Sequence, residues 1–281
     1  MAGDCCYLMA IIADLHMHST YSDGKFEFEK LVSNCISSNL EYFCISDHDT
    51  INHISPIHRY IEENNSSINF IPGTEFTCEF NKSSIHILGY GFDDSSDSIN
   101  DLFIKINQER FDVIQKMGDK LIKLGCKIKY DHILENQNSP GRPHLAKELI
   151  DEGYAENFDD AFDNWLGKGK PGYVQKWKPS AEQVIDLIHE ANGYAFIAHV
   201  GLYKSIQSIN ELLELNLDGI EVYHPDHSAS YSHELIEFCK SNNWIYSGGS
   251  DYHGWEEKNN SIGSYGLDEK SFDQFYEKCL K

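Results

Sequence analysis

Residues 14–24 read DLHMHSTYSDG and follow a short apolar run, which predicts a buried strand ending near Asp14. Side chains two positions apart in a strand point to the same side, so His16 and His18 can reach one metal ion. Asp23 comes next, in a polar turn that ends on a glycine. Such a pair of histidines is a weak signal by itself, because a single histidine is more often an ordinary surface or core residue. The segment therefore needs partners from elsewhere in the chain.

Short apolar segments that end in polar residues alternate with amphipathic helical stretches along most of the chain. The expected strands are Leu8–Asp14, Tyr42–Ser46, Phe70–Glu75, Tyr194–Ala198, Gly219–Val222 and Ile245–Ser247. The expected helices are Phe26–Ser38, Ala181–Ala191, Ser205–Leu215 and His233–Ser241. This alternation predicts an α/β protein with a parallel sheet. A hairpin of Thr77–Phe80 and Ile85–Gly91 is expected within the series.

The alternation breaks in the middle of the chain, where the pattern is helical. A long helical pattern begins near Ile104 and ends at Gly125, a residue type that commonly follows a helix C-terminus. Two shorter helices are expected over His144–Glu152 and Phe158–Leu166. We therefore predict a barrel interrupted by an α-helical insertion. The expected parts are a first part of the barrel at 1–100, a helical insertion (cap) domain at 101–179 and a second part of the barrel at 180–281.

The composition limits the partners that the chain can bind. The 281 residues include 23 Lys and Arg against 45 Asp and Glu, which gives a net charge of −22. Such a charge repels long polyanions, so we expect no stable binding of duplex nucleic acid. No apolar segment approaches the length that spans a membrane. The eight cysteines form no C-x-x-C pair, which disfavours a zinc ribbon and favours a reducing, cytoplasmic location. The oligomeric state stays open.

Residues that can bind metals recur after the other expected strands. Because the carboxyl ends of parallel barrel strands share one face, these side chains are expected to meet there. They are His16, His18, His48, Glu75, His86, His199, Asp251 and His253. Imidazoles and carboxylates without thiolates suit Mn, Fe or Zn, and this set is too large for one ion. Several close ions support displacement at phosphorus. The remaining histidines are interpreted as structural: His53, His58, His132, His189 and His233.

These motifs resemble those of the PHP (polymerase and histidinol phosphatase) family. They stand here as HMH (16–18), SDG (22–24), SDHD (46–49), GTE (73–75), HILGY (86–90), AHV (198–200) and SDYH (250–253). The resemblance extends over nearly the whole chain. It implies a distorted (β/α)7, TIM-like barrel with a site for three divalent metal ions. We expect Mn, with Fe or Zn as alternatives.

The resemblance also implies which side chains share an ion. The first ion would be held by His16, His18, Glu75 and Asp251. Glu75 would bridge to a second ion, which His86 and His199 would also hold. The third ion would be held by Asp23, His48 and His253. Val200 stands where the family usually has proline, but this position supplies no ligand.

The insertion contains the motif GRPHLA (141–146), which resembles that of PHP nucleoside 3′,5′-bisphosphate phosphatases and of RNase AM-type 5′→3′ exoribonucleases. An arginine presents a two-pronged donor to phosphate, and a helix N-terminus attracts anions. Arg142 and His144 are therefore candidate phosphate-binding and catalytic residues. His224, in EVYHP (221–225), is expected near the substrate phosphate, and either His224 or His227 could protonate the leaving oxygen.

Together these features predict a metal-dependent phosphoesterase that acts on nucleotides. The expected substrates are nucleoside 3′,5′-bisphosphates, which would lose the 3′-phosphate, or short 5′-phosphorylated oligoribonucleotides, which would be shortened from the 5′ end. A histidinol-phosphate-type phosphatase is the alternative within the family. A metal-binding regulatory module without catalytic activity is the alternative that is not an enzyme. Such a module is expected to lack a ligand, whereas every ligand position is filled here.

Overall fold

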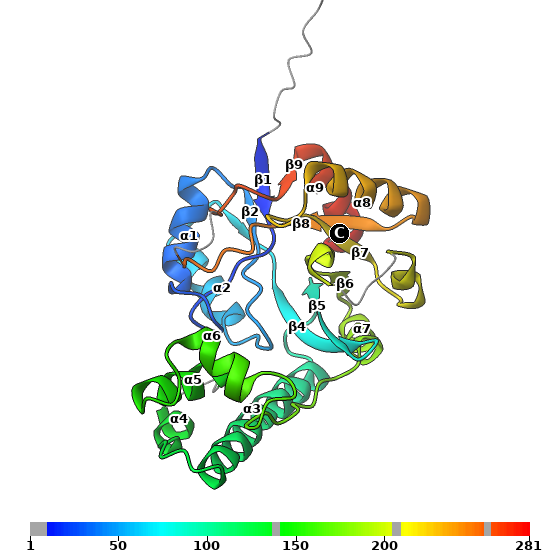
Figure 1. Cartoon of the computed structure of the whole chain (residues 1–281). Coiled ribbons are helices and arrows are strands. Elements are labelled where there is room, and N and C mark those ends of the chain that lie inside the picture. Colours follow the sequence, from blue (N-terminus) through cyan, green and yellow to red (C-terminus); the bar gives the residue numbers. More distant parts are fainter. Residues whose placement is uncertain (1–9, 137–140, 204–208, 256–259) are drawn as a thin grey trace, which may run out of the picture. The chain divides into compact units, whose positions relative to one another are not determined.

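The computed structural model describes residues 10–136, 141–203, 209–255 and 260–281, so parts of two expected elements, Leu8–Met9 and Ser205–Ser208, lie outside the described residues. The chain divides into two units (Figure 1). The barrel unit comprises Met1–Asn100 and Pro179–Lys281, and the insertion unit comprises Asp101–Lys178. Among the described helices, none is both long enough and apolar enough to cross a membrane.

The barrel unit is built from strands and helices that follow each other along the chain. Its strands are β1 (Ile11–Asp14), β2 (Tyr42–Phe43), β3 (Asn69–Phe70), β4 (Gly73–Phe80), β5 (Ser83–Tyr90), β6 (Tyr194–Ile197), β7 (Gly219–Tyr223), β8 (Ile245–Gly248) and β9 (Leu267–Asp268). Its α-helices are α1 (Phe28–Ser37), α2 (Ile54–Glu63), α7 (Ala181–Glu190), α8 (Ala229–Asn242) and α9 (Glu269–Cys279). Two short 3₁₀ helices, Val200–Leu202 and Ile209–Glu214, lie between β6 and β7.

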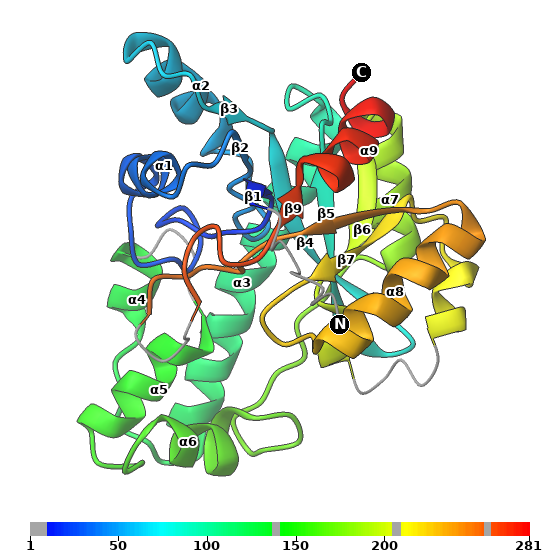
Figure 2. The same cartoon turned by 90° about the horizontal axis from the view of Figure 1, so that it is seen from above.

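The strands form two sheets, with the orders β3-β2-β1-β9 and β4-β5-β6-β7-β8. Parallel pairing joins β1 to β2, β2 to β3, β6 to β7 and β7 to β8, as the alternation predicts. The hairpin expected over Thr77–Phe80 and Ile85–Gly91 is present as β4 and β5, which run antiparallel to each other. The expectation of parallel pairing is wrong between β5 and β6 and between β9 and β1, which also run antiparallel. Helices α7, α8 and α9 pack against strands of the larger sheet (Figure 2).

The strand expected over Phe70–Glu75 is two strands in the structure. Pro72 separates them, because proline has no backbone N–H to donate to a sheet. Glu75 consequently lies on β4, the first strand of the hairpin, where it pairs with Leu88. Because the strand is interrupted at Pro72, Glu75 is not the last residue of a short strand but lies within β4, where it is buried.

Backbone hydrogen bonds link the two sheets at both sides. The Leu15 N–H donates to the Gly248 carbonyl at 3.1 Å, and Met17 forms a parallel bridge with Tyr252. On the other side, His48 forms a parallel bridge with Glu75. These links bring the segments after β1, β2 and β8 together with β4, although the first and last of them lie more than 200 residues apart in the sequence.

The insertion unit has its own apolar core. Its helices are α3 (Asp97–Lys123), which begins in the barrel unit, α4 (Asp131–Asn136), α5 (Arg142–Asp151) and α6 (Phe158–Ala161), followed by a π-helical turn, Phe162–Leu166. Met117 and Leu121 of α3 are fully buried in a cluster with Leu145 and Leu149 of α5. Such a core allows the insertion to hold its helices independently of the barrel sheets.

Candidate metal centre

The Glu75 carboxylate lies at the centre of five imidazole rings. Its Oε2 is 3.1 Å from His16 Nε2, 3.2 Å from His18 Nε2 and 3.2 Å from His48 Nδ1. Its Oε1 is 2.8 Å from each of two further nitrogens, those of His86 (Nδ1) and His199 (Nε2). The side chain of Glu75 is only 1% exposed. A buried carboxylate with this many imidazole neighbours would supply, together with them, the donor types that divalent metal ions accept.

Several buried nitrogen atoms of this cluster have no hydrogen-bond partner in the described structure. These atoms are His18 Nδ1, His48 Nδ1 and His224 Nε2. His16 Nε2 and His18 Nε2 moreover face each other at 3.1 Å. Buried polar atoms are normally paired, so converging ring nitrogens of this kind can bind a cation once they lose their protons. The donor set of imidazoles and carboxylates therefore fits divalent metal ions.

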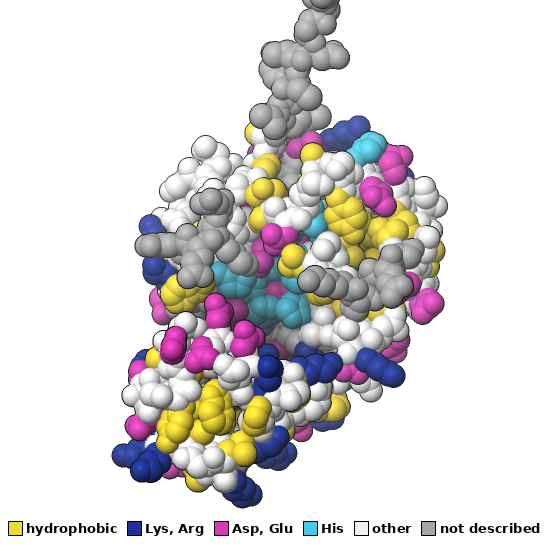
Figure 3. Space-filling view, viewed as in Figure 1, with side chains coloured by type: hydrophobic (Ala, Val, Ile, Leu, Met, Phe, Trp, Pro, Cys, Tyr) yellow, Lys and Arg dark blue, Asp and Glu magenta, His cyan; other side chains and the backbone are white. Residues whose placement is uncertain are grey.

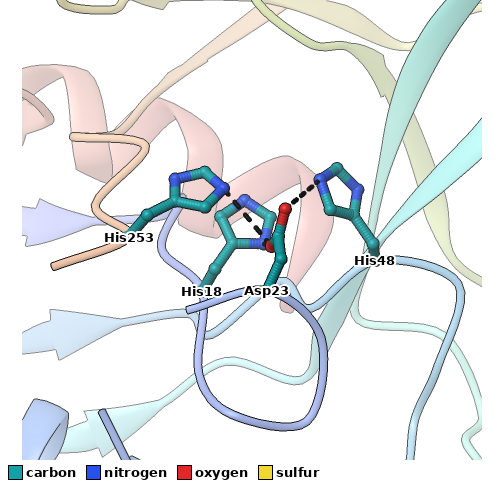
Figure 4. Close-up of side chains that lie close together, drawn as sticks. All are labelled: His18, Asp23, His48 and His253. Carbon is teal, nitrogen blue, oxygen red and sulfur yellow. Dashed lines mark ion pairs between the residues drawn. The ribbon is translucent and has the colours of Figure 1, made fainter. Parts of the chain in front are cut away.

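The second concentration of ligand atoms comprises His18, Asp23, His48 and His253 (Figure 4). One atom from each of the four lies within 4.8 Å of the others. Asp23 Oδ1 is 3.4 Å from His253 Nε2, and Asp23 Oδ2 is 3.8 Å from His48 Nε2. Asp251 Oδ1 is 3.5 Å from His16 Nε2 and 3.3 Å from His18 Nε2. All nine predicted ligands are thus gathered in one cluster, in which His18 belongs to two groups.

Exposure to solvent changes across the cluster. The side chain of His16 is fully buried, whereas those of His48 and His86 are 19% and 26% exposed, and that of Asp23 is 57% exposed. Figure 3 shows histidine side chains gathered at one place on the surface of the barrel unit, with acidic side chains among them. A ligand from solvent therefore meets the side of the cluster that carries Asp23, His48 and His86.

The charges of the cluster fix its protonation in the metal-free protein. Burial opposes a charge on His16, but Glu221 and Glu75 outweigh it and raise the pKa of His16 well above its usual value. Burial likewise opposes a charge on His18, yet hydrogen bonds with Asp251 and Glu75 raise the pKa of His18 to about 10. Burial dominates for His48 and lowers its pKa to about 4.

The carboxylates of the cluster stay ionised in these surroundings. Despite burial, neighbouring imidazoles hold the pKa of Glu75 well below its usual value, and the pKa values of Asp23 and Asp251 are also lowered. Metal ions require neutral imidazoles, so their binding displaces the protons that His16 and His18 retain.

Glu221 on β7 is a site residue to which the sequence assigned no role. Its Oε1 accepts a hydrogen bond from His16 Nδ1 at 2.7 Å, and its Oε2 accepts one from the backbone N–H of His199 at 2.7 Å. The carboxylate is fully buried, and the first contact joins residues 205 positions apart. Glu221 thereby fixes the proton of His16 on Nδ1 and leaves Nε2 free to bind a metal. A charged residue inside the apolar strand GIEVY was the available signal.

Tyr203 is a second residue that the sequence did not indicate. Its hydroxyl oxygen accepts a hydrogen bond from the backbone N–H of His86 at 2.8 Å and lies 3.0 Å from His199 Nδ1. Burial raises the pKa of Tyr203 well above its usual value, so the hydroxyl keeps its proton. Tyr203 connects the two histidines that contact Glu75 Oε1.

His224 and His227 differ in what their ring nitrogens contact. His224 Nδ1 accepts a hydrogen bond from the Asp226 N–H at 3.1 Å, which places the proton on Nε2, 3.5 Å from Asp251 Oδ2. His227 Nδ1 donates to the Val222 carbonyl at 2.9 Å, and its Nε2 accepts from the Gly201 N–H at 3.0 Å. His224 is therefore joined to the cluster, whereas both nitrogens of His227 are occupied by the backbone.

Arg142 and His144 lie in the first turn of α5, in the insertion unit. Arg142 is exposed, and its guanidinium carbon lies 5.4 Å from the centre of the Phe162 ring. His144 Nδ1 accepts a hydrogen bond from the Gly141 N–H at 3.0 Å, so its proton is on Nε2. Both side chains thus carry donors at a helix N-terminus, where an anion is favoured.

The histidines interpreted as structural have other surroundings. His53 Nε2 lies 2.8 Å from the Ile45 carbonyl oxygen, and burial lowers the pKa of His53. His189 contacts Asp218 at 2.8 Å, and His132 contacts Glu148 at 3.2 Å.

The fold and the cluster together define a class of protein, an α/β metal-dependent hydrolase whose candidate ligands come from several strands and from the segments that follow them. Residues 14–229 match the PHP domain. The match covers well over half of the chain, and the chain belongs to the PHP domain family. This membership places it among metal-dependent phosphoesterases.

Curated relatives resemble the chain over most of its length. A protein of Escherichia coli (strain K12), the 5′-3′ exoribonuclease Rnm, is 30% identical over 251 residues, which are 87% of this chain and 86% of that protein. A 3′,5′-nucleoside bisphosphate phosphatase of Chromobacterium violaceum is 27% identical over 258 residues, which are 89% of this chain and 90% of that protein.

Solved structures resemble the chain as well. A protein from Bifidobacterium adolescentis that is assigned to the metal-dependent phosphoesterases has a TM-score of 0.79 and 26% identity, with 96% of each chain covered. An amidohydrolase from Chromobacterium violaceum with bound sulfate has a TM-score of 0.77 and 25% identity, and the match covers 96% of this chain and 98% of that one. The predicted α/β fold of the PHP type is confirmed by these likenesses.

Proposed function

We propose that the chain is a metal-dependent phosphoesterase that hydrolyses phosphate esters of nucleotides. Its substrates are nucleoside 3′,5′-bisphosphates, which lose the 3′-phosphate, or short 5′-phosphorylated oligoribonucleotides, which are shortened from the 5′ end. The observation that carries this proposal is the buried Glu75 carboxylate within 3.2 Å of five imidazole nitrogens. The names of two relatives, an exoribonuclease and a bisphosphate phosphatase, support nucleotides as the substrate class.

The cluster would hold three divalent ions, for which we favour Mn over Fe or Zn. The first ion is assigned to His16, His18, Glu75 and Asp251, the second to Glu75, His86 and His199, and the third to Asp23, His48 and His253. Bound divalent ions supply an activated water and neutralise charge on phosphoryl oxygens. Glu221 orients His16 by accepting a hydrogen bond from its ring. Tyr203 orients His86 and His199, because its hydroxyl group contacts the backbone N–H of His86 and the ring of His199.

His224 is assigned as the proton donor to the leaving oxygen. Its Nε2 carries the proton and lies within the cluster, 3.5 Å from Asp251 Oδ2. His227 is the weaker candidate, because its two ring nitrogens already contact backbone atoms. A proton donor must have its N–H free to reach the substrate oxygen.

Arg142 and His144 are assigned to the substrate phosphate that does not react, the 5′-phosphate of the nucleotide. Arginine binds phosphate through two parallel donors, and the N-terminus of α5 adds its own backbone donors. Recognition of a 5′-phosphate favours bisphosphates and short oligonucleotides. The net charge of −22 agrees with small phosphorylated substrates rather than duplexes. A cytoplasmic location remains our prediction, consistent with the six described cysteines, all free.

One substrate panel tests the proposal. Mn-reconstituted protein is assayed on adenosine 3′,5′-bisphosphate, a 5′-phosphorylated diribonucleotide, histidinol phosphate and p-nitrophenyl phosphate. We expect the two nucleotides to be hydrolysed with kcat/KM well above that of the other two esters. A higher kcat/KM for histidinol phosphate would favour the alternative phosphatase, and hydrolysis of no ester by metal-loaded protein would favour the non-catalytic module. A relative from Eggerthella lenta is named phosphoribosyl 1,2-cyclic phosphate 1,2-diphosphodiesterase, so phosphoribosyl 1,2-cyclic phosphate completes the panel.

A further inference from the structure

An exposed tryptophan lies beside the open side of the metal-ligand cluster. The Trp255 side chain is 53% exposed, and its indole N–H donates a hydrogen bond to the backbone carbonyl of Asp23 at 3.0 Å. Asp23 is itself the most exposed of the candidate ligands. Single exposed aromatic rings are common, but this one is hydrogen-bonded to the backbone of a candidate ligand, where its free face can meet a ligand.

The backbone around Trp255 holds the ring in place. The N–H of Lys25 donates to the carbonyl of His253 at 2.8 Å, which ties the segment after Asp23 to the segment before Trp255. Gly254 has a φ of +78°, and a Cβ there would come within 2.7 Å of the Phe26 ring. Glycine is required at this turn, and the turn sets the direction of Trp255. A ring fixed in this way loses little conformational entropy when it binds a ligand.

A cation accompanies the ring. The ammonium of Lys25 lies 5.8 Å from the centre of the Trp255 ring, within the range of a cation–π contact, and Lys25 is exposed. The barrel unit otherwise carries a large excess of acidic residues. The open side of the cluster thus presents a flat ring and a positive charge together. This combination fits a ligand that has both a flat aromatic part and a phosphate.

We propose that Trp255 is the stacking platform for the nucleobase of the substrate. The reacting phosphate of a nucleotide is drawn to the metal-loaded cluster, and the base then lies against the indole ring, which Asp23 anchors next to the same cluster. Stacking on an aromatic side chain tolerates any base, since every base has a π-face. The platform therefore selects nucleotides over other phosphate esters without selecting one base. This proposal rests on the proposed function, because it specifies how the same site recognises nucleotides.

Equilibrium binding tests the platform separately from catalysis. Calorimetry on the Mn-loaded protein compares AMP with ribose 5-phosphate, which has the phosphate and the sugar but no base. We expect the wild-type protein to bind AMP more tightly than ribose 5-phosphate, and Trp255→Ala to lose about 5- to 150-fold in affinity for AMP, the range typical of base stacking. Trp255→Ala should leave the affinity for ribose 5-phosphate unchanged. Trp255→Phe, which keeps an aromatic face, should retain most of the preference.

Two control variants show whether an effect is specific to the Trp255 ring. Lys25→Met removes the cation but keeps the ring, so the preference for AMP over ribose 5-phosphate should persist. Tyr276→Ala removes another exposed aromatic ring of the barrel unit, on α9, and should change neither affinity. The proposal is overturned if wild-type protein binds the two ligands equally, if Trp255→Ala weakens both to the same extent, or if Lys25→Met alone abolishes the preference.

If Trp255→Ala does not fold, an NMR measurement on the wild-type protein tests the same proposal. The indole N–H signal of Trp255, assigned by its loss in Trp255→Phe, should shift when AMP is added and stay in place when ribose 5-phosphate is added. An unchanged signal at saturating AMP would overturn the platform. If the protein hydrolyses no nucleotide in the substrate panel while this signal shifts, the proposed function fails and the nucleotide platform stands.

Discussion

The barrel unit and the insertion unit differ in how their charges are distributed. Residues 101–178 contain 13 Lys and Arg and 13 Asp and Glu, so the insertion is neutral, whereas the remainder of the chain has 10 basic and 32 acidic residues and carries the whole net charge of −22. The candidate ligands of the barrel are mostly buried and held by strand ends. The insertion instead presents exposed Arg142 at the start of a helix.

This difference in charge suits the two units to different ligands, metal ions for the barrel unit and phosphate for the insertion unit. A cluster of buried carboxylates and imidazoles attracts cations and repels anions, so it suits metal ions better than it suits a free phosphate. A unit without net charge and with an exposed arginine opposes the binding of phosphate less than the acidic barrel unit does. We therefore assign the chemistry to the barrel unit and the selection of the 5′-phosphate to the insertion unit. Variants that act on one task and spare the other test this division.

The largest effect is expected at the centre of the cluster. Glu75→Gln removes the charge that five imidazoles share, and should lower kcat/KM for a nucleoside bisphosphate about 1,000-fold or more, since bound ions contribute several kcal/mol to transition-state stabilisation. The metal content, measured by plasma mass spectrometry, should fall as well. Glu79→Gln, on the same strand, is the matched control and should change neither quantity. Full activity of Glu75→Gln with full metal content would contradict the assignment.

A smaller and more selective effect is expected in the insertion. Arg142→Ala should lower kcat/KM for 5′-phosphorylated substrates by about 10- to 150-fold, the range of a hydrogen bond to a charged group. Activity on adenosine 3′-monophosphate and the metal content should remain unchanged. Lys147→Ala, on the same helix, removes an equally exposed positive charge and serves as the control. Equal losses on substrates with and without the 5′-phosphate would contradict the division of tasks.

The buried Glu221 should affect metal affinity more than folding. Glu221→Gln keeps the size of the side chain but turns one acceptor into a donor, which then faces the His16 ring or the His199 N–H. We expect a 10- to 100-fold weaker affinity for Mn, roughly the usual effect of losing the partner of a ligating histidine. Titration with a metal indicator dye measures it, with exposed Glu234→Gln on α8 as the control. An unchanged Mn affinity would remove Glu221 from the site.

The smallest expected effect is a shift of thermal stability with pH. The pKa of His18 is raised to about 10 in the metal-free fold, so the proton on His18 stabilises that fold fully below about pH 6.5, and this contribution is lost as the pH rises toward 10. Metal ions replace the proton. The Tm difference between metal-loaded and metal-stripped protein should therefore widen between about pH 7 and 9.5. The buried cysteines are present in both the metal-loaded and the metal-stripped protein, so their titration does not change the Tm difference. A constant difference would contradict the raised pKa.

The sequence predicted which candidate ligands would lie together, because strand geometry is local. The spacing of His16 and His18 and the position of His48 after a strand follow from the alternation of side chains and from where apolar runs end. The same reasoning predicted the α/β class. It missed the antiparallel direction of β5 toward β6, because the apolar pattern of a strand is the same for both directions.

Other features depend on contacts that no local pattern contains. The link between Glu221 and His16 spans 205 residues, so only the fold reveals it. The difference between His224 and His227, three residues apart, comes from which backbone atoms their rings meet. Pro72, by contrast, was a visible signal that one expected strand is two.

We propose that the Glu75 cluster is a metal centre that hydrolyses a nucleotide phosphate ester. The most direct measurement is the release of inorganic phosphate from adenosine 3′,5′-bisphosphate by wild-type protein, first stripped of metal and then titrated with Mn. We predict no release from the stripped protein, activity that rises with bound Mn and reaches its maximum near three ions per chain, and no recovery in Glu75→Gln. Equal phosphate release before and after stripping, or none at full Mn occupancy, would contradict the claim.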